Sequence, residues 1–191
     1  MTGRMNFLPA GATYLSDFIG ADEEAALVRA LDDGVWSAEL RRRVQHFGYR
    51  YDYTARTVTA DAYIGELPDW ATPVCRKLRA EADFGSGPDQ AIANEYLPGQ
   101  GISAHVDCVP CFSERIASLS LLSSCEMIFR NKKKGERLSA ILEPRSLLIL
   151  SGEARYEWTH EIPARKSDEV NGVKQARGRR ISLTFRTVTP A

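Results

Sequence analysis

Long hydrophobic runs are missing from this sequence. Nowhere do roughly eighteen apolar residues follow one another, the length that a membrane-spanning helix needs. Segment 1–11 has neither the basic start nor the apolar stretch of an export signal. We therefore expect a cytoplasmic protein that is neither secreted nor bound to a membrane. Hydrophobic residues make up 43% of the chain and charged ones 26%, a globular composition that argues against disorder.

Cysteine is scarce, with four residues in a chain of 191. Without an export signal, Cys75, Cys108, Cys111 and Cys125 are expected to be reduced thiols instead of a disulfide framework. Cys108 and Cys111 form a C-x-x-C, but neither a second such motif nor a histidine pair accompanies it. We interpret the pair as structural or incidental thiols, with sensitivity to oxidation as the alternative.

A net charge is also absent, because 25 basic and 25 acidic residues cancel. Their distribution is uneven: residues 1–100 contain 10 Lys and Arg against 15 Asp and Glu, whereas residues 101–191 contain 15 against 10. This asymmetry allows, without requiring, a basic surface around a site in the second half. The phosphates of a nucleic acid would need such a surface.

Two helices are predicted in the first half of the chain. Residues 21–33 place apolar side chains at helical spacing, with acids in the first turn and Gly34 after the end. Residues 69–82 have Pro73 in the first turn, and glycine follows at position 85. Both helices precede the segments that carry candidate catalytic residues.

Between these helices, aromatic residues recur with the period of two that is typical of a strand. One face of a predicted hairpin would then be aromatic. Two interpretations stay open: the rings pack on the core, or they belong to a lid whose rings stack on a base while arginines reach phosphates. The aromatic residues are Phe47, Tyr49, Tyr51 and Tyr53, and the arginines are Arg41, Arg42, Arg43, Arg50 and Arg56.

From residue 89 onward, short apolar runs alternate with turn residues. Seven or more short strands favour an antiparallel sandwich or barrel, and a double-stranded β-helix, or jelly roll, fits that number. The predicted fold class is mostly β with flanking α. We expect one domain over 1–191, in which helices and a lid hairpin at 1–88 precede a jelly-roll core at 89–191.

The chain contains three histidines, and two of them are candidate metal ligands. His105 and Asp107 are two positions apart, so on an extended strand both side chains project to the same face. His160 follows 53 residues after Asp107, which is enough chain for several strands to return beside the pair. Two histidines and one carboxylate leave metal positions open, as an Fe(II) oxygenase needs, whereas structural zinc takes four protein ligands. These three residues are the predicted metal ligands and catalytic centre.

Segment 180–186 predicts a strand with two arginines on its inner face. A guanidinium is always charged and binds a carboxylate through two parallel hydrogen bonds. Two inward arginines are costly unless anions meet them, and the dicarboxylate 2-oxoglutarate would supply those anions. The inner face comprises Arg180, Ser182, Thr184 and Arg186, and the apolar face comprises Ile181, Leu183 and Phe185.

Four ordered motifs over roughly residues 90–187 resemble the AlkB family, the Fe(II) and 2-oxoglutarate-dependent dioxygenases that oxidise alkyl groups on nucleic acids. The resemblance implies that Asn94 and Tyr96 hydrogen-bond 2-oxoglutarate and that Arg180 binds its distal carboxylate. It implies that Arg186 also engages the cosubstrate, and Ser182, where many relatives have Asn, adds a weaker contact. Fe(II), 2-oxoglutarate and O₂ are the implied cofactors. The motifs are Asn94-Glu95-Tyr96, His105-Val106-Asp107, His160 and the strand at 180–186.

The resemblance also implies a function: oxidative dealkylation or hydroxylation of nucleic-acid bases, in RNA such as tRNA or in alkylated DNA. DNA-repairing relatives often carry an acidic residue two positions after the iron aspartate, where this chain has Val109. The stretches around His105 and His160 are more similar to AlkB homologues that hydroxylate the tRNA wobble uridine, which favours RNA. Arg155 and Tyr156 are predicted at the substrate mouth, with half-exposed residues at a strand end as the alternative.

Two other functions stay open. The same chemistry would serve a modified protein side chain or a small molecule. A jelly-roll module without enzymatic activity would use the same histidines and arginines to bind an anion. In each case we expect a monomer.

Overall fold

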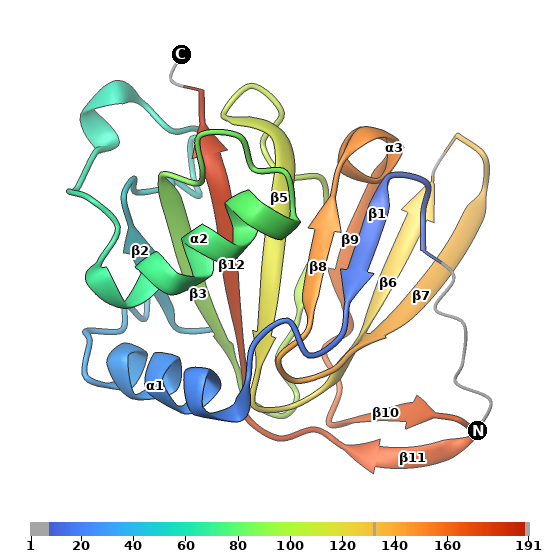
Figure 1. The fold of residues 1–191 in the computed structure, drawn as a ribbon. Coiled ribbons are helices and arrows are strands. Elements are labelled where there is room, and N and C mark those ends of the chain that lie inside the picture. The colour runs from blue at the N-terminus through green and yellow to red at the C-terminus, as the bar shows by residue number, and fades with distance from the viewer. Residues whose placement is uncertain (1–7, 132, 190–191) are drawn as a thin grey trace.

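The main sheet of the protein has six antiparallel strands and is flanked on one side by helices. The computed structural model describes residues 8–131 and 133–189. In that part of the chain, the order of the main sheet is β1-β8-β5-β12-β3-β2 (Figure 1). Its strands are β1 (Ala12–Leu15), β2 (Val44–Phe47), β3 (Gln90–Tyr96), β5 (Phe112–Leu121), β8 (Leu147–Leu150) and β12 (Arg180–Val188).

A second sheet of four antiparallel strands, in the order β4-β9-β6-β7, contributes the other wall of the inner cavity. Its strands are β4 (Ile102–His105), β6 (Cys125–Asn131), β7 (Glu136–Leu142) and β9 (Trp158–Ile162). A separate hairpin is made of β10 (Ser167–Val170) and β11 (Val173–Ala176). Among the described residues, the ten strands from β3 to β12 agree with the prediction of seven or more short strands from residue 89 onward.

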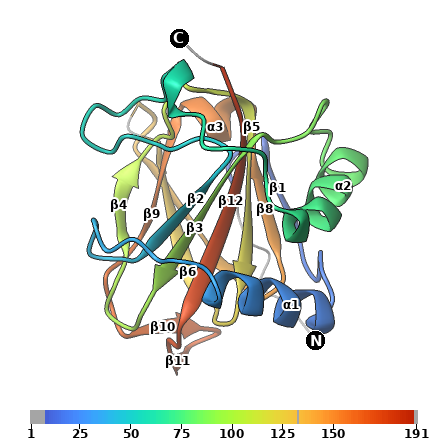
Figure 2. The same cartoon turned by 90° about the vertical axis from the view of Figure 1, so that its left-hand side faces the viewer.

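The two predicted helices are confirmed. They are α1 (Ala21–Asp32) and α2 (Thr72–Glu81), and a 3-10 turn over Asp69–Ala71 leads into α2. Both lie on the outer face of the six-stranded sheet (Figure 2). A short helix, α3 (Gly152–Tyr156), precedes β9, and a 3-10 turn spans Ala60–Ala62. None of the helices in the described ranges is long and apolar enough to cross a membrane.

Strand β12 separates the two hydrophobic clusters of the protein. Ile181, Leu183 and Phe185 are fully buried in the cluster that contains the apolar faces of α1 and α2. Ser182, Thr184 and Arg186 point the other way and line a cavity between the sheets. The predicted alternation along this strand is therefore confirmed, and it positions the polar residues of the candidate site.

The aromatic hairpin strand predicted between the helices is wrong beyond Phe47, where β2 ends. Gly48 follows with a φ of +78°, and a Cβ there would collide with the carbonyl of Asp89. Such left-handed backbone breaks the period of two. The chain then runs through loops with isolated bridges from Tyr49 to Tyr63 and from Asp52 to Thr57. The first 88 residues also supply β1 and β2 to the main sheet, so residue 88 is not a boundary within the sheet.

Candidate metal centre

The pairing of β4 with β9 brings the three candidate ligands together. His105 lies directly opposite His160 in this antiparallel pair, and the centroids of their rings are 4.3 Å apart. Strand β4 ends at His105, so Asp107 lies just beyond the strand, with its Oδ1 3.7 Å from Nε2 of His105. One ligand atom from each of the three residues lies within 4.8 Å of the others.

Asp107 and His160 are in the protonation states that a metal requires. Burial alone would raise the pKa of Asp107, but the charges of Arg186, His160 and His105 hold it well below its usual range. Burial lowers the pKa of His160 to about 4, so this imidazole is neutral at neutral pH. A carboxylate and a neutral imidazole are ligand forms that suit a divalent cation.

A backbone contact orients the ring of His105. Its Nδ1 lies 2.7 Å from the carbonyl oxygen of Ser103. When Nδ1–H donates to this carbonyl, Nε2 is left with its lone pair available to a metal. Two imidazoles and one carboxylate, with no fourth protein ligand in the cluster found among the described residues, fit Fe(II) better than structural zinc.

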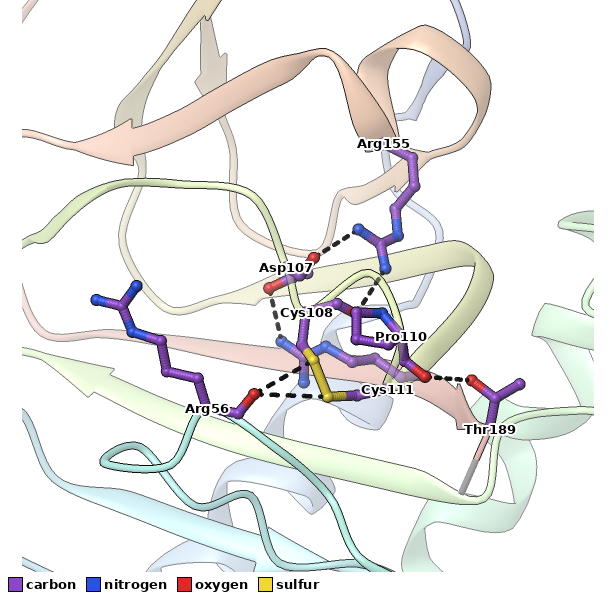
Figure 3. Close-up of a disulfide and its surroundings, with 8 residues drawn as sticks. Arg56, Asp107, Cys108, Pro110, Cys111, Arg155 and Thr189 are labelled. Atoms are coloured by element: carbon purple, nitrogen blue, oxygen red, sulfur yellow. Dashed lines mark hydrogen bonds and ion pairs between the residues drawn. A yellow bond between two sulfur atoms is a disulfide. The ribbon is translucent and has the colours of Figure 1, made fainter. Parts of the chain in front are cut away.

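The guanidinium of Arg155 lies behind Asp107, inside the protein. It donates hydrogen bonds to the carbonyl oxygens of Asp107, at 2.8 Å, and Cys108, at 3.0 Å (Figure 3). Arg155 is 2% exposed, whereas its neighbour Tyr156 is 43% exposed. Both the prediction of Arg155 at the substrate mouth and its half-exposed alternative are wrong, because α3 turns this side chain inward toward the loop that carries Asp107.

The expectation of four reduced thiols is wrong for one pair. Cys108 and Cys111 form a disulfide directly after Asp107 (Figure 3), whereas Cys75 and Cys125 are free and buried. The turn between the paired cysteines brings their Cα atoms to 5.3 Å, within the range that a disulfide spans. The prediction of reduced thiols rested on the missing export signal, which carries no information on the geometry of this turn.

A cavity of about 60 Å³ lies between the sheets beside the three candidate ligands. The predicted cosubstrate residues Asn94, Tyr96, Ser182 and Arg186 all line it. Arg180 lies next to it, 2% exposed, with its guanidinium 5.6 Å from the centre of the Tyr96 ring. The structure therefore places all five predicted cosubstrate residues in or beside one cavity.

Both arginines of β12 keep donor nitrogens without a protein partner. Arg180 donates from Nη2 to Oγ of Ser120 at 2.8 Å, whereas its buried Nε and Nη1 have no acceptor among the described residues. Nη2 of Arg186 lies 3.4 Å from Oδ1 of Asp107. The buried Nε of Arg186 also has no acceptor among the described residues. Buried donors normally have partners. A bound dicarboxylate would supply them, so the residues present fit 2-oxoglutarate.

Several polar residues of the cavity were missed from the sequence. Ser118 lines it and shares a 2.8 Å hydrogen bond with Ser182, and Ser120 accepts the bond from Arg180. The two serines alternate with apolar residues along β5, a signal of period two that marks one strand face. Arg42 was predicted only as a phosphate contact, yet it donates to Oδ1 of Asn94 at 2.8 Å.

A larger outer pocket of about 580 Å³ adjoins the cavity, and Asn94, His105, Asp107 and Arg186 line both. Arginines and tyrosines of the predicted lid line its outer part. These residues are Arg41, Arg42, Tyr51, Tyr53 and Arg56. We call segment 41–56 the entrance segment.

Two of the predicted substrate residues lie elsewhere. Phe47 packs edge-on against Trp70, at 5.0 Å between ring centroids, on the helix side of the sheet. Tyr49 packs against Tyr63 at 5.2 Å. Neither lines the outer pocket, so for these two rings the core-packing interpretation fits. Val109, two residues after Asp107, is 49% exposed.

Comparisons with known proteins agree with this geometry. The model of the 2OG-Fe(II) oxygenase superfamily matches residues 11–186. The alkylated DNA repair protein ALKBH8 homolog of Arabidopsis thaliana is 37% identical over 93% of this chain. The tRNA (carboxymethyluridine(34)-5-O)-methyltransferase ALKBH8 of Mus musculus is 35% identical over 95% of it. The chain spans 58% and 31% of the length of these two relatives.

Among solved structures, OsALKBH1 superposes with a TM-score of 0.72, covering 95% of this chain and 98% of that one. Its sequence is 19% identical, so this similarity shows the fold alone. The predicted class, a mostly β jelly roll with flanking helices, is confirmed. The resemblance to AlkB homologues, recognised from four short motifs, extends over nearly the whole chain.

Proposed function

Because this chain belongs to the 2OG-Fe(II) oxygenase superfamily, we propose that it is a dioxygenase that uses Fe(II), 2-oxoglutarate and O₂ to oxidise bases of nucleic acid, with RNA as the favoured polymer. One observation carries the proposal. A three-residue ligand cluster and two arginines, whose buried donors have no acceptor in the described part of the chain, surround one cavity, which adjoins a pocket lined by arginine and tyrosine. We further propose a single catalytic domain that acts as a monomer in the cytoplasm.

His105, Asp107 and His160 hold the metal in this proposal. When bound there, Fe(II) and 2-oxoglutarate would supply the activation of O₂ needed to oxidise a C–H bond, with succinate and CO₂ as the products of the cosubstrate. The protein keeps the carboxylate of Asp107 charged and the imidazole of His160 neutral. Arg186, 3.4 Å from Asp107, lies at the metal end of the cavity.

Arg180 binds the distal carboxylate of 2-oxoglutarate in this proposal. Its guanidinium lies beside Tyr96 and carries two buried nitrogens, Nε and Nη1, that have no acceptor among the described residues and are donors for a carboxylate. Asn94 and Ser182, on facing positions of β3 and β12, supply polar contacts along the same wall. Arg42 fixes the amide of Asn94 from the outside.

The entrance segment binds the nucleic acid in this proposal. Tyr51 and Tyr53 contact each other edge to face at 5.2 Å and offer rings to an unstacked base. Arg41 and Arg56 line the same pocket and are placed to meet phosphates. A relative whose name refers to tRNA carboxymethyluridine, together with the non-acidic Val109, supports RNA over alkylated DNA.

The experiment supplies purified protein with Fe(II), 2-oxoglutarate and ascorbate, together with tRNA, single-stranded alkylated DNA or no polymer. Mass spectrometry of nucleosides then measures oxidised or dealkylated bases. We expect a change in tRNA nucleosides that is absent with His105→Ala. Turnover of 2-oxoglutarate without any change in either polymer would contradict the nucleic-acid substrate and favour a protein side chain or small molecule.

The role of the entrance arginines is tested by the double variant Arg41→Gln with Arg56→Gln. The affinity for tRNA should fall about tenfold at low salt, and the dependence of affinity on salt should become shallower, because phosphate contacts are lost. The matched control is Arg137→Gln on β7, an exposed arginine at the edge of the second sheet. It should keep the affinity and salt dependence of the unaltered protein.

A further inference from the structure

The Cys108–Cys111 disulfide begins one residue after the proposed ligand Asp107, and the proposed function gives it no role. Cys108 lines the outer pocket, together with His105 and Asp107, whereas Cys111 is 4% exposed. A small molecule that reaches the metal through this pocket therefore also reaches Cys108. Cys75 and Cys125, by contrast, are both buried in the hydrophobic clusters.

Hydrogen bonds hold the backbone of this loop on two sides (Figure 3). Arg155 donates to the carbonyl oxygens of Asp107 and Cys108. On the other side, the backbone N–H of Thr189 donates to the carbonyl of Cys111 at 2.9 Å, and its hydroxyl donates to that of Pro110 at 3.1 Å. Between these anchors, the disulfide closes the loop, so its state affects how rigidly Asp107 is held.

The same sulfur atoms contact the entrance segment. Sγ of Cys108 lies 3.4 Å and Sγ of Cys111 lies 3.8 Å from the carbonyl oxygen of Arg56. A disulfide sulfur carries no proton, whereas a thiol is a weak donor. Reduction therefore opens the loop and at the same time lets the thiols donate hydrogen bonds to the entrance segment.

We propose that Cys108 and Cys111 form a thiol–disulfide exchange site for low-molecular-weight thiols and disulfides of the glutathione type, and that its oxidised form holds Asp107 ready for the metal. In the oxidising direction, the Cys108 thiolate attacks glutathione disulfide, forms a mixed disulfide and releases one glutathione thiol. Cys111 then displaces the second. The two electrons go to the glutathione, and the two protons end on the two released glutathione thiols.

The coupling to the metal rests on the proposed function, and it is reciprocal. If the closed loop holds Asp107 in place, the disulfide form binds a divalent ion more tightly. The metal must then favour the disulfide by the same factor. The probe is Mn(II), a cation that prefers oxygen and imidazole ligands, because a softer metal would also bind the free thiols.

The first experiment equilibrates the protein with defined ratios of reduced to oxidised glutathione, blocks free thiols by alkylation and measures each cysteine by mass spectrometry. We expect Cys108 and Cys111 to interconvert together, while Cys75 and Cys125 stay reduced throughout. The exchange site is overturned if the pair does not respond to the ratio, or if all four cysteines oxidise alike.

The second experiment titrates Mn(II) into the oxidised and the reduced protein. We expect the dissociation constant to rise at least about fivefold on reduction, and Mn(II) to shift the glutathione midpoint of the pair by the same factor. The double variant Cys108→Ser with Cys111→Ser keeps hydroxyl donors near Arg56 but cannot close the loop. It should bind Mn(II) like the reduced protein under every redox condition.

The outcomes separate the two proposals. Equal Mn(II) affinity in both redox forms would overturn the coupling and leave the proposed metal site standing. Absence of Mn(II) binding in both forms would overturn the metal site and the coupling together, whereas the glutathione titration would still decide the exchange site on its own.

Discussion

The inner site and the entrance segment are built in different ways. Strands carry or directly precede the inner residues: His105 and His160 are paired across β4 and β9, and Arg180 and Arg186 are six positions apart on β12. In the entrance segment, strand structure is limited to Val44–Phe47, and loops with isolated bridges follow. In the proposed function, chemistry that needs fixed geometry lies on the strands, whereas recognition of the substrate lies on loops that tolerate change.

The largest effect is expected from Asp107→Ala. This change removes the only carboxylate of the ligand cluster, so Mn(II) affinity should fall more than about 100-fold, beyond the loss typical of residues behind the ligands. Succinate formation should disappear with it. Tyr51→Ala, in the entrance segment, should leave Mn(II) affinity unchanged. Equal losses of Mn(II) affinity in the two variants would contradict the proposed difference between the inner site and the entrance segment.

Arg180→Gln comes next. Loss of a buried guanidinium that meets a carboxylate costs about 2–3 kcal/mol, so the KM for 2-oxoglutarate should rise about 30- to 150-fold. The matched control is Arg179→Gln on the preceding residue, which pairs with Asp32 and Glu95 outside the cavity. It should lower stability but keep the KM. A KM unchanged in Arg180→Gln would remove Arg180 from the cosubstrate site.

Arg155→Gln tests whether Arg155 supports the proposed ligand Asp107 through a hydrogen bond to the backbone of Asp107. The shorter amide cannot reach the carbonyls of Asp107 and Cys108 together, so Mn(II) affinity should fall about tenfold while the KM for tRNA stays constant. Arg155→Lys should recover part of the loss. If Arg155→Gln instead raised the KM for tRNA alone, Arg155 would belong to the substrate mouth.

A smaller effect is expected in the entrance segment. Tyr51→Ala removes a ring that we propose stacks on a base, which should raise the KM for tRNA about tenfold, corresponding to about 1.4 kcal/mol. The KM for 2-oxoglutarate should not change. Tyr63→Ala is the control, because Tyr63 is an exposed tyrosine that packs against Tyr49 and does not line the outer pocket. Equal effects in both variants would argue for general loosening of the loops.

The smallest effect concerns His46 of β2. Burial lowers its pKa to about 4, against an opposing charge from Glu39 and reinforcing charges from Arg50 and Arg186. Between pH 6.5 and 4 the unfolded chain takes up this proton and the folded protein does not, so stability falls as the pH falls. Relative to His46→Gln, the unaltered protein should lose about 1 kcal/mol over this range, because partial exposure screens the effect. Urea unfolding at several pH values measures the difference, and parallel curves would contradict it.

Local patterns in the sequence were sufficient for the helices and for the two faces of β12. The grouping of His105, Asp107 and His160 was also anticipated, because few residues of these types exist and H-x-D places both side chains together. The turn at Gly48 was not anticipated, since the period of two carries no information on a left-handed residue. The disulfide depends on the geometry of one short turn, which the argument from cellular compartment does not contain. The inward position of Arg155 depends on contacts with a distant segment, which a local pattern does not contain.

The most direct measurement of the central claim is succinate formation from 2-oxoglutarate by the purified protein with tRNA present. The account predicts succinate that requires added Fe(II), increases with tRNA and is lost in both His105→Ala and Arg180→Gln at low 2-oxoglutarate. Succinate formation that persists without Fe(II), or at equal rates in His105→Ala, would contradict it.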